Sequence, residues 1–184
     1  YDDYNGSFYQ TDQKVFENFA YQLRQRGYGL RFIEAKSKIN VAKQLISLDK
    51  QYGQVNKISF AVIGGHGDKD RIRFGLGKNQ GTLSSQDLFG KGVRRTGKFF
   101  IEKPVLILNS CEVGQADGIA QNLSSIFGTK VIASEVKTEG LKRINIKDTE
   151  NKQLDIDVDF ETGIMEERVT ENIYENGLKS QTTK

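Results

Sequence analysis

The stretch Pro104-Val105-Leu106-Ile107-Leu108-Asn109-Ser110-Cys111-Glu112 decides how this chain is organised. It holds four consecutive large apolar residues, a pattern typical of a strand that is buried on both faces of a sheet. The only proline of the chain opens the run, and a proline is tolerated at the first residue of a strand. We therefore expect residues 105–108 to form the central strand of a sheet, with the only cysteine, Cys111, in the loop that follows.

Predicted helices and strands alternate on either side of this strand. Apolar residues recur at spacings of three and four in three segments, which predicts helices, and short apolar runs predict strands. The predicted helices run from Thr11–Asp12 to Gly27, from about Asn40 to Tyr52 with Val41, Leu45, Ile46 and Leu48 inward, and from Ile119 to Gly128. The predicted strands are residues 28–35, 58–63, 105–108 and 130–134. This alternation favours parallel strands that helices cover on both faces.

The hydrophobic period changes after Gly140. Apolar residues alternate strictly with aspartates over 154–160, which predicts a strand with one solvated face, in a hairpin or meander with residues 141–147 and 164–174. We expect one domain over residues 1–179, with an α/β core over 1–140, a β extension over 141–175 and a loose tail over 180–184. Because the first residue is Tyr1 rather than Met, we expect a segment of a longer protein.

The composition excludes several kinds of site. The 184 residues contain no apolar run near the roughly 18 residues that span a bilayer, and the start lacks the features of a retained signal peptide. One cysteine forms no internal disulfide, and one cysteine with one histidine does not supply the usual metal-ligand sets. We therefore expect no membrane span and no metal; we also expect no nucleic-acid partner.

Charge is distributed unevenly around a net value of +3. Residues 148–175 hold ten acidic residues against two basic ones. Basic residues gather in two clusters: Lys91, Arg94, Arg95, Lys98 and Lys103, and Lys137, Lys142, Arg143 and Lys147. We interpret both clusters as solvated surface, with attraction of an anionic partner as the alternative.

The only histidine, His66, and the only cysteine each follow directly on a predicted strand. Loops at the carboxyl ends of parallel strands form the ligand site of such sheets. A histidine transfers protons near neutral pH, and a thiolate is the most nucleophilic ordinary side chain. The amide groups of Gly67 and Cys111 would donate to an oxyanion. Taken singly, each residue is more typical of a structural role; together they predict a catalytic dyad.

Gly65-His66-Gly67 after one apolar strand, and Asn109-Ser110-Cys111-Glu112 after a second, resemble the motifs of caspase-like (clan CD) cysteine peptidases. The resemblance covers about residues 28–135. The short spacing from histidine to cysteine is similar to that of the autoprocessing cysteine peptidase domains of large bacterial toxins. The Cys-Glu-x-Gly element and the helix after it also resemble the caspase-like domains called CHAT.

The resemblance implies a three-layer α/β/α caspase-like fold, with a mostly parallel central sheet and a C-terminal β-hairpin or meander. It implies that Cys111 attacks the scissile carbonyl, that His66 protonates the leaving amine, and that the Gly67 and Cys111 amides bind the oxyanion. The substrate is then a polypeptide, the parent chain included. It would extend along a sheet edge near Ser134–Arg143 and pair by β-addition.

The resemblance leaves the residue before the cut open. A pocket lined by Asp68, Asp117 or Glu135, beside Ser134, would favour Arg or Lys, whereas an apolar pocket would favour Leu as in the toxin domains. The toxin peptidases also carry a basic flap that responds to an inositol polyphosphate, which would order the flap and complete the substrate groove. The residues expected in that flap here are Lys137, Lys142, Arg143 and Lys147.

Three functions follow from these observations. The first is a cysteine endopeptidase that processes its own larger chain or a partner, in a bacterial cytoplasm or as part of a delivered toxin. The second is a catalytically silent caspase-like scaffold that binds a protein or a polyanion. The third is acyl transfer to an acceptor other than water. A scaffold has no chemical need for the histidine and the cysteine, so we favour the endopeptidase.

Overall fold

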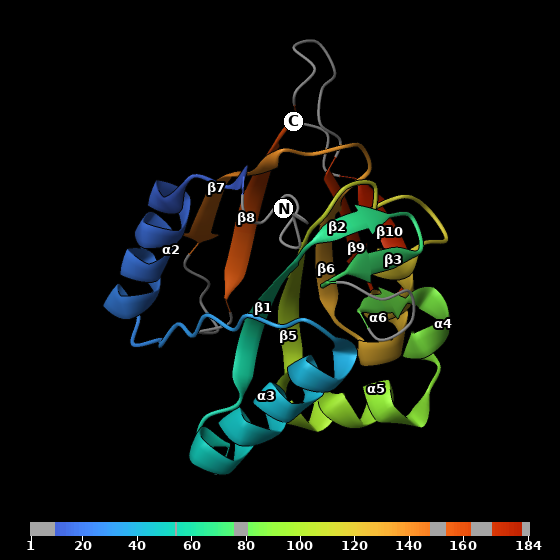
Figure 1. The fold of residues 1–184 in the computed structure, drawn as a ribbon. Helices are drawn as coiled ribbons and strands as arrows, with labels where there is room; N and C mark the ends of the chain where they lie inside the picture. The colour runs from blue at the N-terminus through green and yellow to red at the C-terminus, as the bar shows by residue number, and fades with distance from the viewer. Residues whose placement is uncertain (1–9, 54, 76–80, 148–153, 163–170, 182–184) are drawn as a thin grey trace.

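Strand β5 (Phe100–Asn109) contains the apolar run of the sequence and lies inside a five-stranded sheet. The computed structural model describes residues 10–53, 55–75, 81–147, 154–162 and 171–181. The strand order of the sheet is β1-β5-β6-β9-β10 (Figure 1). The other four strands are β1 (Ile58–Gly64), β6 (Lys130–Ser134), β9 (Glu171–Glu175) and β10 (Leu178–Gln181).

This sheet is mixed. Strands β1, β5 and β6 are parallel, whereas β9 pairs antiparallel with β6 and β10 pairs antiparallel with β9. The prediction of a mostly parallel sheet therefore holds only for its first three strands. Strand β5 has a neighbour on both sides, as expected, but the middle position belongs to β6.

Alternate residues of β5 enter two separate cores, because successive side chains of a strand point to opposite faces. Val105 and Ile107 pack with helix α2 (Gln13–Gln25) and with the hairpin of β7 (Gly140–Lys147) and β8 (Asp155–Glu161). Leu106 and Leu108 pack with helix α6 (Ile119–Phe127) and with the short helix α4 (Ser85–Leu88). The unbroken apolar run of β5 thus covers both faces, and Figure 1 shows these two layers on opposite sides of the sheet.

The three predicted helices are present. Helix α2 begins after its N-cap Asp12, α3 (Lys38–Tyr52) begins after the N-cap Ser37, and α6 ends at the left-handed Gly128 with φ 60°. One predicted inward residue of α3 is wrong, because the side chain of Ile46 is 46% exposed.

The predicted strand over 28–35 does not form. Tyr28 and Leu30 pack against the core around α2, but Phe32 and Ile33 are exposed. The segment pairs with no described strand, and β1, at the edge of the sheet, pairs with β5 alone among the described strands. Only part of this apolar run is therefore buried, by side-chain packing and not by strand pairing.

The glycine-rich stretch before β5 has more structure than expected. It contains a separate three-stranded sheet and two further short helical segments. These elements are β2 (His66–Asp68), β3 (Arg71–Arg73), β4 (Thr82–Ser84), α5 (Lys91–Thr96) and the 3₁₀ helix η1 (Gly97–Phe99).

The C-terminal part corrects two further expectations. Strand β8 alternates buried and partly buried residues and pairs with β7, as predicted. Residues 171–174, however, belong to β9 in the main sheet and not to this hairpin, and residues 163–170 lie outside the described residues. The expected loose tail is also wrong for residues 180 and 181, because both pair with β9.

Candidate active site

The carboxyl ends of β1 and β5 lie side by side. In the parallel register, Gly64 is the partner of Asn109, and the Gly65 N–H donates to the Asn109 carbonyl oxygen at 3.4 Å. Strand β2 starts at His66, two residues after Gly64, and Cys111 lies two residues after Asn109, in the turn that follows β5. The topology therefore brings the only histidine and the only cysteine of the chain to the same edge of the sheet.

Gly67 lies directly against the turn that carries Cys111. A Cβ atom built on Gly67 would lie 2.7 Å from the Cβ atom of Ser110 and 2.8 Å from both the Cys111 carbonyl oxygen and a methyl carbon of Val113. These separations are shorter than real Cβ contacts, so only glycine lets the two backbones approach this closely. The Gly67 position is thus explained by packing between the two candidate segments.

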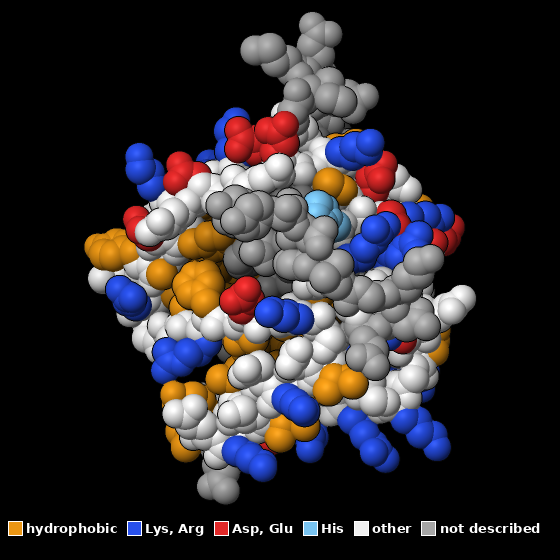
Figure 2. Space-filling view, viewed as in Figure 1, with side chains coloured by type: hydrophobic (Ala, Val, Ile, Leu, Met, Phe, Trp, Pro, Cys, Tyr) orange, Lys and Arg blue, Asp and Glu red, His pale blue; other side chains and the backbone are white. Residues whose placement is uncertain are grey.

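The hairpin that carries His66 is held at its far end as well. The Ile119 N–H, at the start of α6, donates to the Lys69 carbonyl oxygen in the hairpin turn at 2.9 Å. A Cβ atom on Gly118 would lie 2.5 Å from the same oxygen. His66 itself is exposed and pairs in register with Arg73 (Figure 2). The sequence predicted His66 in a loop, whereas it opens a short strand.

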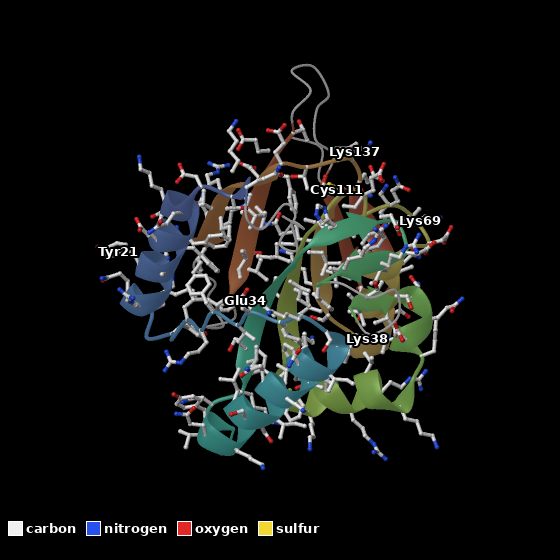
Figure 3. All side chains as sticks on the ribbon, in the orientation of Figure 1. Tyr21, Glu34, Lys38, Lys69, Cys111 and Lys137 are labelled. Atoms are coloured by element: carbon white, nitrogen blue, oxygen red, sulfur yellow. The ribbon has the colours of Figure 1, made fainter. Side chains whose placement is uncertain are left out.

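The Cys111 thiol is partly buried and contacts the segment that leads into β7. Its Sγ–H donates to the Thr138 carbonyl oxygen at 3.4 Å. In the same turn, the N–H of Glu112 donates to Val136 at 3.1 Å, and the N–H of Gly114 donates to Ser134 at 2.8 Å. The nucleophile candidate is therefore fastened to residues 134–138 by main-chain bonds, and Figure 3 shows Cys111 and Lys137 at the same end of the molecule.

Two non-glycine residues of this turn adopt the left-handed backbone conformation. Glu112 has φ 60° and Asp117 has φ 57°. Such conformations cost on the order of 1 kcal/mol each and persist only where the surroundings impose them. The turn after the cysteine is thus shaped by its contacts with the neighbouring segments rather than by local preference.

The candidate substrate-binding carboxylates differ in their surroundings. Asp68 accepts from Arg71 Nε at 2.6 Å and lies 3.9 Å from Arg73 Nη2, so two cations offset its charge. Glu135 pairs with Lys179 Nζ at 2.7 Å. Asp117 is exposed and has no cationic partner among the described residues.

The fourth candidate, Ser134, is fully buried. Its hydroxyl donates to the Val136 carbonyl oxygen at 3.1 Å, and the Val136 N–H donates back to the hydroxyl at 3.3 Å. A substrate therefore has no access to this side chain in this structure.

The edge expected for β-addition is already occupied. Strand β6 pairs with β5 on one side and with β9 on the other. Strand β7 pairs with β8, and its opposite edge is met by the amide of Gln22, which accepts from the Ile146 N–H at 2.9 Å and donates to the Ile144 carbonyl oxygen at 3.2 Å. Among the described residues, both edges of β6 are therefore paired, and Gln22 covers Ile144 and Ile146 on the outer edge of β7.

The four candidate polyanion-binding residues are all exposed, but two have acidic partners. Arg143 lies 2.5 Å from Asp159, and Lys147 lies 3.6 Å from Asp157, both across the β7–β8 hairpin. Lys137 and Lys142 have no carboxylate partner among the described residues.

Sequence reasoning missed a buried node between three distant segments. Thr11 Oγ1 accepts from Asn109 Nδ2 at 3.1 Å and from the Leu141 N–H at 2.9 Å. This hydroxyl joins the residue before the N-cap of α2 to the last residue of β5 and to the start of β7. Nothing in the sequence indicated this, because its members are 98 and 130 residues apart.

Burial also shifts the pKa of a tyrosine behind the turn. Its desolvation and the charge of Glu135 raise the pKa of Tyr174, whose hydroxyl donates to the Gly114 carbonyl oxygen at 2.8 Å. Asn172 Nδ2 donates to the same oxygen at 2.8 Å. This backbone carbonyl is therefore held by two buried side chains, which stiffens the turn that begins at the cysteine.

The described residues hold neither a metal-ligand cluster nor a membrane-spanning helix. They contain no group of three or more His, Cys, Asp or Glu side chains placed to hold a metal ion. Within the same ranges, no helix is long and apolar enough to cross a bilayer.

A family model described as a domain of unknown function (DUF8616) matches residues 37–143, and the chain belongs to that family. The match spans the three parallel strands and includes both His66 and Cys111. No curated protein and no solved structure matches the chain.

Proposed function

We propose that this member of the DUF8616 family is a cysteine endopeptidase with a caspase-like three-layer fold and a His66/Cys111 dyad. The observation that carries the proposal is the contact of two backbones: Gly67 lies against Ser110 and Cys111 so closely that a Cβ atom would not fit. That contact brings the histidine and cysteine segments together at the carboxyl edge of two parallel strands.

The reaction follows from the chemistry of the two side chains. The Cys111 sulfur, as thiolate, attacks the scissile carbonyl carbon, and the carbonyl oxygen becomes an oxyanion that the Gly67 and Cys111 amides stabilise. The C–N bond then breaks, and His66 delivers a proton to the leaving amine. Water hydrolyses the resulting thioester, which releases the acid product and regenerates the thiol.

The resting contact of the thiol bears on this scheme. Sγ–H donates to the Thr138 carbonyl oxygen, so the sulfur must leave that oxygen before it attacks a substrate. The segment 135–139 is therefore placed to respond to substrate, and β7 continues directly from it. Charge offset at Asp68 and Glu135 weakens both as partners of a basic residue before the cut, which leaves Asp117 as the candidate carboxylate without a cationic partner among the described residues.

The segment 135–139 also links the proposed polyanion site to Cys111. Lys137 is adjacent to Thr138, and Lys142 lies on β7 without an acidic partner among the described residues. An inositol polyphosphate bound to these two cations would order the segment whose carbonyl holds Sγ, provided that it prefers the ordered state. Titration with inositol hexakisphosphate should then raise the melting temperature and the cleavage rate, and K137Q/K142Q should remove both effects.

Labelling with an electrophile tests the dyad directly. Because Cys111 is the only cysteine, the mass gained on native alkylation reports on it alone. We expect rapid labelling by an acyloxymethyl ketone in the native state and slower labelling of H66A, while C111A takes no label. A native Cys111 that labels no faster than in unfolded protein contradicts catalysis and favours the silent scaffold.

Cleavage assays complete the test, with a peptide library and the parent chain as substrates. C111A should abolish cleavage with the fold intact, and H66A should slow cleavage by roughly 10²–10⁴-fold, the usual contribution of proton transfer. Cleavage that survives in C111A would show that the nucleophile is misassigned.

A further inference from the structure

The amino ends of β1 and β5 lie at the opposite end of the sheet from the candidate active site, and basic residues surround them. Ile58 is the register partner of Phe100, so the loop before β1 and the η1 segment before β5 meet there. Helix α3 leads into this end, and α5 leads into η1. We call the seven exposed cations of these elements the basic pole: Lys50, Lys57, Lys91, Arg94, Arg95, Lys98 and Lys103.

Few carboxylates accompany the cations of the basic pole among the described residues. None of the seven cations has an ion-pair partner among the described residues, and the only carboxylates within the second half of α3, residues 55–58 and 91–103 are Asp49 and Glu102. In the lower half of Figure 2, basic side chains predominate, whereas most acidic side chains lie in the upper half. The molecule therefore carries a strong charge asymmetry along the direction of its parallel strands.

Exposed apolar side chains stand among these cations. Val55, two residues before Lys57, is 86% exposed, and Ile101 is 36% exposed. Between Ile58 and Phe60 the register of β1 with β5 shifts, and residues 101–103 of β5 are exposed at this irregularity. Ile101 is thus exposed two residues before Lys103, as Val55 is two residues before Lys57.

We infer that the basic pole docks the domain on an anionic lipid surface. A bilayer that contains acidic lipids attracts clustered Lys and Arg, and exposed apolar side chains gain free energy when they enter the interface. A nucleic acid would use the cations but would gain little from the exposed aliphatic side chains of Val55 and Ile101, which enter a lipid interface readily. The apolar residues therefore decide in favour of lipid.

Docking in this way leaves the candidate active site open. Strands β1 and β5 begin at the basic pole and end next to His66 and Cys111, so the two sites lie at opposite ends of the same parallel strands. A domain held by its basic pole would present the His66 and Cys111 edge away from the lipid. The inference stands on the charge and exposure of the pole and does not depend on the proposed peptidase activity.

Co-sedimentation of the full chain with vesicles tests the inference. The probes are phosphatidylcholine vesicles with and without phosphatidylserine, at low and high salt. The pole variant is R94Q/R95Q/K98Q. The matched control is K14Q/R24Q/K36Q, which removes the same charge from exposed cations elsewhere. A second variant, V55S/I101S, removes the apolar side chains only.

We expect binding that requires phosphatidylserine and weakens as salt screens the charges. The pole variant should bind roughly 100-fold more weakly, at about fivefold for each cation near an anionic surface, and the control should bind within about twofold of the wild type. V55S/I101S should lose the part of binding that persists at high salt. Equal loss in the pole variant and the control would overturn the inference, as would binding to duplex DNA or RNA without binding to the vesicles.

Discussion

Replacement of Gly67 by alanine tests whether the contact between the two candidate segments is as tight as the structure indicates. The new Cβ atom would meet the Ser110 Cβ atom at 2.7 Å, and the Cys111 carbonyl oxygen and a Val113 methyl carbon at 2.8 Å each. None of these atoms is the end of a long flexible side chain, so the backbone must move. Overpacking of this kind costs about 1–3 kcal/mol.

That free energy converts into a measurable shift. For a domain of this size, 1 kcal/mol corresponds to roughly 2–4 °C in melting temperature, so G67A should melt about 2–12 °C below the wild type. The same displacement should separate His66 from Cys111, so native alkylation of the single cysteine should slow. Thermal unfolding followed by circular dichroism, together with labelling kinetics, measures both effects.

Gly92 provides the matched control, because it undergoes the same chemical change in open surroundings. A Cβ atom on Gly92 meets nothing within 4 Å, and this residue lies inside helix α5. Alanine is favoured over glycine in a helix by up to about 1 kcal/mol, so G92A should be neutral or slightly more stable. If G67A is as stable as G92A and labels at the wild-type rate, the close approach of the two segments is refuted.

Three further predictions concern the surroundings of the site. T11V removes the acceptor shared by Asn109 Nδ2 and the Leu141 N–H, both in a buried setting, and should lower the free energy of unfolding in urea by about 1–3 kcal/mol; an unchanged midpoint would contradict the node. D87N should cost about 1 kcal/mol at neutral pH. Burial acts to raise the pKa of Asp87, but Lys38 Nζ and the N–H and hydroxyl of Ser84, which all donate to its carboxylate, lower the pKa overall. The stabilisation is therefore present above the unfolded pKa near 4 and is lost as pH falls through the folded value, and a penalty that does not shrink in acid would refute this sign. The pKa of Tyr174 is raised by burial, so its ionisation, followed by ultraviolet difference absorbance, should begin above the usual value near 10. The free energy of unfolding of the wild type should fall more than that of Y174F as pH rises through that range, and equal losses would contradict the buried hydroxyl.

The sequence alone was sufficient for the parallel part of the fold. Residues 105–108 are apolar at every position, and only a strand covered on both faces uses such a run, so the position of β5 and its two-sided core followed directly. The strand ends after 63 and 108 placed His66 and Cys111 at one edge, because parallel strands end on the same side of a sheet. The local hydrophobic pattern was enough for these predictions, because each of them depends on residues that are close together in the sequence.

Contacts between distant segments were decided only by the tertiary structure. The segment 28–35 has an apolar pattern but forms no strand, although β1 at the edge of the sheet pairs with β5 alone among the described strands; Tyr28 and Leu30 pack on the core by their side chains instead, so propensity did not decide the outcome. Residues 171–174 pair with β6 instead of the hairpin, which closes the edge where a substrate strand was expected. The hydrogen bonds of Thr11 and the contact of the Cys111 thiol with Thr138 join segments that are distant in the sequence, and the periodicity of apolar residues gives no information about which distant segments meet. The sequence thus identified which residues carry chemistry, and the folded chain determined what each of them contacts.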